Sequence, residues 1–125
     1  MIERIKLEIE LVESNFGELE VDPSLRWLVV KRWKLVPGWN KKEARILLLI
    51  PPGYPTTPPD NFFTDADFRL EGGAKPEPTS FASPVDGQQW LQFSYHVEAS
   101  DWQPDKGHNL VTFLLGAGKR LSETN

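Results

Sequence analysis

The first third of the chain opens with an amphipathic pattern. Five apolar residues recur at helical spacing, with glutamate and lysine between them: Ile2, Ile5, Ile9, Val12 and Phe16. A shorter set, Ile5 to Leu11, also alternates as a strand would. We interpret this segment as a helix over 2–16, and Gly17 stands where a helix would end in the left-handed conformation.

Two longer runs carry the strand pattern most clearly. Residues 26–36 are rich in β-branched and aromatic side chains and end at Pro37-Gly38, a turn signal. A second run over 43–50 ends at Pro51. Two long strands with a short turn between them predict an antiparallel hairpin, and residues 18–22 are expected to add a first strand before it.

The middle of the chain is less regular. Six of the nine residues from Pro51 to Pro59 are proline or glycine, so neither a helix nor a central strand fits there. Residues 61–64 predict a short strand. Residues 71–89 collect glycine, proline and serine and are expected to form a long connection.

The last third predicts a short extended piece over 90–97 and then a helix. Either Asp105 or Asn109 would cap this helix. Its apolar face consists of Leu110, Leu114, Ala117 and Leu121. Gly116 and Gly118 would each weaken it by roughly 1 kcal/mol.

Composition narrows the possible classes. A chain of 125 residues supplies one core, so we expect a single domain over 1–125 of the α+β class. The net charge of −4 disfavours nucleic-acid binding, and no apolar run is long enough to predict a membrane span. The absence of cysteine and of a signal-like amino terminus indicates a cytoplasmic location, and nothing in the sequence calls for a cofactor.

The candidate chemistry lies in the stretch WLQFSYHVEASDWQP, residues 90–104. In an extended segment, Ser94 and His96 would project to one face, so the imidazole could act as the general base for the hydroxyl. Glu98 or Asp101 would orient the imidazole. The plainer alternative is two half-exposed residues on a strand, and a metal site built from His96, His108 and Asp101 is a further alternative.

Three sequence motifs make the chain resemble a known protein family. Tyr54, Pro55, Pro58 and Pro59 form a Y-P-x-x-P-P turn, Trp102 and Pro104 form W-x-P, and Trp90, Ser94 and His96 precede it. The chain thereby resembles ubiquitin-conjugating enzymes, and in particular the bacterial branch called prokaryotic ubiquitin-conjugating family E. The resemblance implies a UBC-like fold with an amino-terminal helix, a four-stranded antiparallel meander, the proline-rich turn, a catalytic loop and a carboxy-terminal helix.

The resemblance also implies an activity. In the family the catalytic cysteine lies about eight residues before the tryptophan of W-x-P, and that position is Ser94 here. A transferase of this kind would carry a ubiquitin-like protein as an oxyester on Ser94 and pass it to a target. Two departures stand against it, because the chain has no His-Pro-Asn before Ser94 and the connection from the proline turn is long. The alternative is a non-catalytic adaptor of the same fold that binds the ubiquitin-like protein or its activating enzyme.

The partners that the resemblance implies are a ubiquitin-like protein, a ThiF-like activating enzyme and a deconjugating peptidase, in a setting of antiviral defence. Members of the family meet their activating enzymes through the amino-terminal helix. The same helix over 2–16 is therefore the surface expected to meet such an enzyme here.

Overall fold

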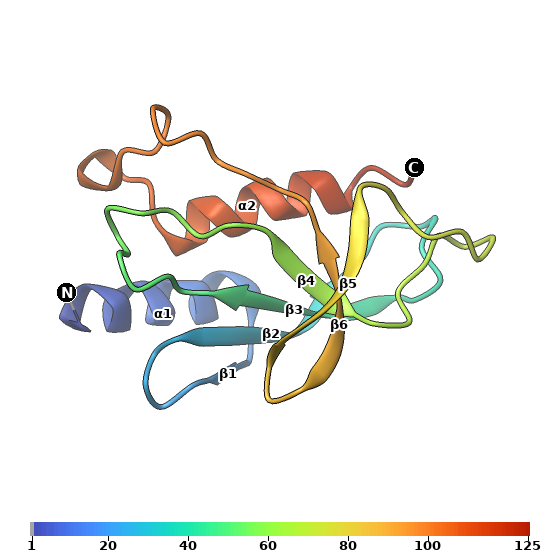
Figure 1. Ribbon diagram of the computed structural model, residues 1–125, viewed down its shortest axis with the longest axis horizontal. Coiled ribbons are helices and arrows are strands. Elements are labelled where there is room, and N and C mark those ends of the chain that lie inside the picture. The colour runs from blue at the N-terminus through green and yellow to red at the C-terminus, as the bar shows by residue number, and fades with distance from the viewer. Residues whose placement is uncertain (1) are drawn as a thin grey trace.

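Two long helices and six strands make up the fold in this computed structural model, which describes residues 2–125. The elements in chain order are α1 (Ile2–Phe16), β1 (Leu19–Val21), β2 (Trp27–Lys34), β3 (Glu43–Leu49), β4 (Phe62–Asp65), β5 (Thr79–Val85), β6 (Gln88–Phe93), a 3-10 turn η1 (Pro104–Lys106) and α2 (Leu110–Leu121) (Figure 1). The predicted helices and the strands at 18–22, 26–36, 43–50 and 61–64 are confirmed to within two residues at each end.

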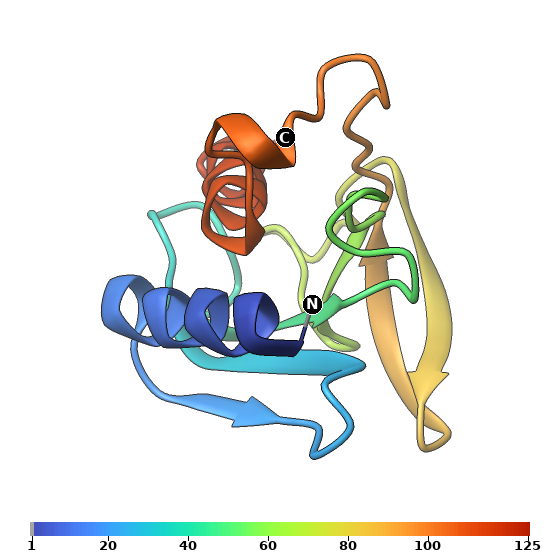
Figure 2. The ribbon, with the colours of Figure 1, turned by 90° about the vertical axis from the view of Figure 1, so that its left-hand side faces the viewer.

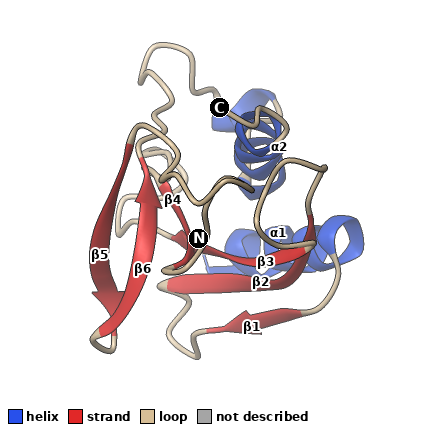
Figure 3. Cartoon of the chain, turned by 90° about the vertical axis from the view of Figure 1, so that its right-hand side faces the viewer, coloured by secondary structure: helices blue, strands red, loops and turns tan. Residues whose placement is uncertain are grey.

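The six strands form one antiparallel sheet with the order β1-β2-β3-β4-β6-β5. Both helices lie on the same side of it, and β5 and β6 run steeply across the direction of β1 and β2 (Figure 2). Figure 3 shows the same curled sheet from the opposite side. The class is α+β as predicted, with a helical layer on one face of the sheet.

The predicted four-stranded meander is wrong in its strand count. The segment expected as a connection over 71–89 contains β5, which pairs with β6 and places a hairpin at one edge of the sheet. Asp86 and Gly87 make its turn with φ angles of 51° and 72°. Both angles are positive, as a tight two-residue hairpin turn requires, and Val85 faces Gln88 directly across it.

The main core lies between the helices and the sheet. Its fully buried side chains include Leu28, Ile46, Phe62, Phe93, Phe113 and Leu114. A smaller cluster of Val29, Leu47, Phe63 and Trp90 lies apart from it, with Trp27 packed at its border. The aromatic residues of the central strands therefore pack into the molecule on both sides of the sheet.

Asn109 is the residue that caps α2. Its side chain accepts the Thr112 N–H at 3.0 Å, and the Thr112 hydroxyl accepts the Asn109 N–H at 2.8 Å, which together form a capping box. Of the two predicted caps, Asn109 is confirmed, whereas Asp105 lies one turn earlier in η1.

Candidate active site

Ser94 follows the last residue of β6 and is exposed. Phe93 still pairs with Phe62 in β4, but the next contact joins Asn61 to Tyr95 instead of Ser94. Ser94 therefore lies just past the end of the β4–β6 ladder, and the first backbone contact beyond the ladder, from the Asn61 N–H to the Tyr95 carbonyl, skips Ser94. On its other side, the Ser94 N–H donates to the Pro78 carbonyl at 3.1 Å, which fixes the backbone at this point.

Asn61 holds the segment after Ser94 in place. Its N–H donates to the Tyr95 carbonyl at 2.8 Å, and its side-chain Oδ1 accepts the Tyr95 N–H at 3.2 Å. Asn61 adopts a left-handed φ of 61°, which asparagine tolerates better than most residues. Tyr95 itself turns toward the core, where its ring packs edge-on against Phe62 and Phe113.

His96 pairs with a residue that sequence analysis did not select. Its Nδ1 lies 2.5 Å from Oδ1 of Asp60, the residue that follows the proline-rich turn. Both side chains are well exposed, at 61% for His96 and 68% for Asp60. The sequence signal for Asp60 was a lone carboxylate directly after Pro58-Pro59, far from the stretch that holds Ser94.

The other predicted site residues lie nearby on the surface. Ser94, Glu98 and Asp101 are all exposed, as His96 is. Within residues 2–125, no hydrogen bond joins Ser94 to His96, and the carboxylates of Glu98 and Asp101 do not contact the imidazole. The roles assigned to these residues from sequence therefore remain predictions.

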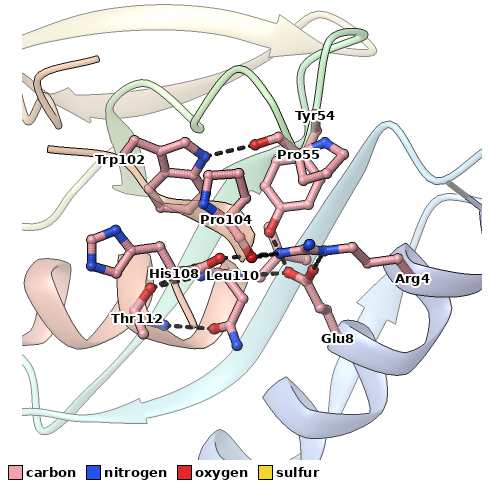
Figure 4. Close-up of polar contacts among 10 residues, drawn as sticks. Arg4, Glu8, Tyr54, Pro55, Trp102, Pro104, His108, Leu110 and Thr112 are labelled. Atoms are coloured by element: carbon pink, nitrogen blue, oxygen red, sulfur yellow. Dashed lines mark hydrogen bonds and ion pairs between the residues drawn. The ribbon is translucent and has the colours of Figure 1, made fainter. Parts of the chain in front are cut away.

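The motif residues behind this surface are held by a buried carboxylate. Glu8 of α1 is only 4% exposed and accepts hydrogen bonds from the Tyr54 hydroxyl, from the Leu110 N–H at 2.9 Å and from Arg4 Nε at 2.5 Å (Figure 4). Arg4 Nη2 also donates to the Pro104 carbonyl at 2.8 Å. The Arg4–Glu8 pair thereby connects α1 to the proline-rich turn and the start of α2 through Glu8, and to the W-x-P segment through Arg4.

The environment of Tyr54 favours its neutral form. Burial is the larger cause, and the hydrogen bond to Glu8 is the second, and both raise the pKa of the Tyr54 phenol above its ordinary value. Tyr54 therefore stays a hydrogen-bond donor to Glu8 across the physiological range. Its role is to hold the turn in place.

The remaining motif residues are buried or partly buried. Trp102 donates its indole N–H to the Pro55 carbonyl at 2.6 Å and lies beside His108 (Figure 4). His108 accepts the Gln103 N–H at 2.9 Å, which closes the turn before α2. Trp90 packs under the Arg45 guanidinium, 4.6 Å from the ring centroid. These tryptophans anchor the segments on both sides of Ser94.

A cavity of about 590 Å³ opens beside the Asp60–His96 pair. Asp60, Asn61 and Gln92 belong to its lining, together with Trp27, Phe63 and Val85. Because Gln92 precedes Ser94 by two residues, the cavity extends from the smaller cluster toward the exposed segment. The lining is thus mixed, with apolar side chains between polar ones that include Arg26 and Asp86 as well as Asp60, Asn61 and Gln92.

Two kinds of feature are absent from residues 2–125. The histidines and carboxylates there form no group of three or more arranged to hold a metal ion. No helix in that range has the length and apolar character needed to cross a bilayer.

Comparison with known proteins gives one match. The model of a family described as prokaryotic E2 family E matches residues 9–123, whereas no curated protein and no solved structure matches the chain. The matched range includes the Y-P-x-x-P-P turn, the Ser94 segment and W-x-P. The chain therefore belongs to prokaryotic E2 family E, a family of ubiquitin-conjugating-like proteins, which implies a ubiquitin-like protein and an activating enzyme as its partners.

Proposed function

We propose that this protein is a transferase that carries a bacterial ubiquitin-like protein as an oxyester on Ser94 and passes it to a target. The observation that carries the proposal is the position of Ser94 just past the end of β6. Ser94 is exposed there, eight residues before the buried Trp102, between backbone contacts on both sides. A fixed backbone with a free hydroxyl is what an acyl-carrying serine requires.

His96 is the proposed general base. A serine hydroxyl is a weak nucleophile at neutral pH, so a neighbouring group must accept its proton. His96 lies two residues further along and is exposed on the same segment, while Tyr95 between them packs inward. The hydrogen bond from Ser94 to His96 would form when an acyl donor occupies the site, since such contacts are often long in unliganded enzymes.

The partners in this proposal are a ThiF-like activating enzyme that loads the protein and a peptidase that removes the modifier from targets. Antiviral defence is the proposed setting. The exposed Ser94 segment suits this role, because a large partner must bring its carboxyl terminus to the hydroxyl without entering a deep cleft.

The test is a loading assay with ATP, a ubiquitin-like protein and a ThiF-like activating enzyme from the same genome, followed by intact mass and denaturing gel. We expect an adduct that resists thiols, is cleaved by hydroxide and is lost in Ser94→Ala. Ser100→Ala is the matched control, since Ser100 is an exposed serine in the same segment. Its adduct should equal that of the wild type.

The alternative function is a non-catalytic adaptor that binds the ubiquitin-like protein or the activating enzyme. The missing hydrogen bond between Ser94 and His96 within residues 2–125 favours it. In the same assay an adaptor would bind its partner without forming an adduct, and Ser94→Ala would leave the binding unchanged. That outcome would replace the transferase proposal.

A further inference from the structure

We infer that Asp60 is a positioning residue for the Ser94 site, because it holds the His96 imidazole with its Nε2 nitrogen free to accept the serine proton. The inference rests on the proposed function, since it assigns a role within the same acyl transfer. Asp60 stands outside the serine-containing stretch and comes from the end of the proline-rich turn.

The contact is built into the sheet. Asn61 is tied to Tyr95 through two hydrogen bonds, one from its backbone and one to its side chain. Asp60 and His96 are the immediate chain neighbours of this pair, so the hydrogen bonds between Asn61 and Tyr95 also bring the side chains of Asp60 and His96 together. The proline-rich turn leads directly into Asp60, and the Trp102 hydrogen bond to Pro55 fixes that turn against the segment after His96.

The chemistry follows from which nitrogen carries the proton. Neutral imidazole has one donor nitrogen and one acceptor nitrogen. When the Asp60 carboxylate accepts a hydrogen bond from Nδ1–H, the proton stays on Nδ1 and Nε2 keeps its lone pair. An exposed ion pair is worth little energy in water, so the contribution of Asp60 lies in selecting the tautomer and the ring orientation.

The acyl-transfer step then balances without another reactant. Ser94 Oγ forms a bond to the acyl carbon of a thioester or acyl adenylate, and the bond from that carbon to the leaving thiolate or AMP breaks. The Ser94 proton moves to Nε2 of His96, which passes it to the leaving group. Asp60 stays ionised throughout and stabilises the imidazolium that forms between the two transfers.

The first test uses p-nitrophenyl acetate as the acyl donor, because it needs no partner protein. Ser94 Oγ would take the acetyl group and release p-nitrophenolate, and peptide mass would locate the acetyl group. We expect Asp60→Asn to slow acetylation of Ser94 by about ten- to a hundredfold, since its amide favours the wrong tautomer. Asp60→Glu should restore part of the rate.

The control is an exposed carboxylate that has no role in the proposed site. Asp105→Asn should acetylate at the wild-type rate, because Asp105 lies on the surface in η1. The inference would be overturned by a wild-type rate in Asp60→Asn, by an equal loss in Asp105→Asn, or by the absence of any Ser94-dependent acetyl group in the wild type.

A second readout separates positioning from a purely structural role. In protein labelled with ¹⁵N at histidine, at a pH where the ring is neutral, His96 should carry its proton on Nδ1 in the wild type and on Nε2 in Asp60→Asn. An unchanged tautomer would overturn the inference. A different outcome would refute only the carrier function. In that case Asp60→Asn slows acetylation and changes the His96 tautomer as expected, but the wild type forms no modifier adduct in the loading assay.

Discussion

At the scale of single residues, Glu8 is the buried carboxylate that joins α1 to the proline-rich turn and to the start of α2. A buried carboxylate is costly unless it is paired and hydrogen-bonded, and Glu8 has three donors from three separate segments. Tyr54 of the proline-rich turn donates to Glu8 itself, and the Pro104 carbonyl of W-x-P accepts from Arg4, the ion-pair partner of Glu8. One ion pair on α1 therefore holds both motifs.

Tyr54→Phe tests this network. The substitution keeps the ring and removes one donor to a buried carboxylate, so we expect it to lower the free energy of unfolding by about 1.5–3 kcal/mol. Because burial and the Glu8 bond raise the pKa of Tyr54, its contribution is complete below about pH 10 and is lost as the pH rises further. Urea unfolding at neutral and alkaline pH measures both effects.

Tyr95→Phe is the matched control for that experiment. Its hydroxyl forms no hydrogen bond within residues 2–125, and burial alone raises the pKa of Tyr95. Tyr95→Phe should therefore lower the free energy of unfolding at neutral pH much less than Tyr54→Phe does. Equal losses for the two variants would contradict the role given to the Tyr54 donor.

Some of the candidate site residues lie close together in the sequence, and one lies far from the others. Ser94 was selected from the resemblance and His96 from its local spacing to Ser94, and both are exposed on the same short segment. Asp60 lies 36 positions from His96, and their contact depends on how β4 and β6 align. That alignment is completed by the Asn61–Tyr95 contacts just beyond the strands, which residue patterns do not reveal.

At the scale of elements, β5 is the strand that the sequence analysis missed. Its side chains are half-buried or exposed, and it contains serine and Pro84 where a central strand would carry apolar residues. It is an edge strand, with a register shift between Ala82 and Val85. The Asp86-Gly87 pair was the available signal, since Asp-Gly between two extended runs indicates a hairpin.

The two glycines of α2 also have a structural reason that helix propensity does not show. A Cβ on Gly116 would lie 1.8 Å from the Tyr95 hydroxyl, and one on Gly118 would lie 2.9 Å from the Trp33 ring. Both positions let an aromatic side chain approach the helix backbone. Gly116 and Gly118 are weak helix formers, but they allow α2 to pack closely against these aromatic side chains.

Gly116→Ala should therefore destabilise the protein although alanine favours helices by about 1 kcal/mol. We expect a net loss of about 1–3 kcal/mol in the free energy of unfolding, because Tyr95 is packed between Phe62 and Phe113 and must shift. A shift of Tyr95 would also disturb its bonds to Asn61. Thermal unfolding measures the loss, and Leu115→Ala on the exposed side of α2 controls for changes in the helix itself.

At the scale of the whole molecule, the candidate active site and the outer face of α1 lie on different parts of the surface. The Ser94 segment and the Asp60 turn lie beyond the ends of the strands, while α1 presents an outer face on the helical side (Figure 2). That face carries Leu7 and Leu11, which are 61% and 47% exposed and one helical turn apart. Neither contributes to the core, so their apolar character is available to a partner.

We expect this face of α1 to meet the activating enzyme. Leu7→Lys combined with Leu11→Lys should slow loading by the enzyme about tenfold or more, because burying each leucine at an interface is worth about 1.5–3 kcal/mol. Stability should change little, since both side chains are exposed and lysine forms helices about as well as leucine. Acetylation of Ser94 by p-nitrophenyl acetate should also stay unchanged, which separates docking from chemistry.

Leu115→Lys is the control, because Leu115 is 58% exposed on α2. An equal loss of loading in that control would mean that surface hydrophobicity in general, and not α1, recruits the enzyme.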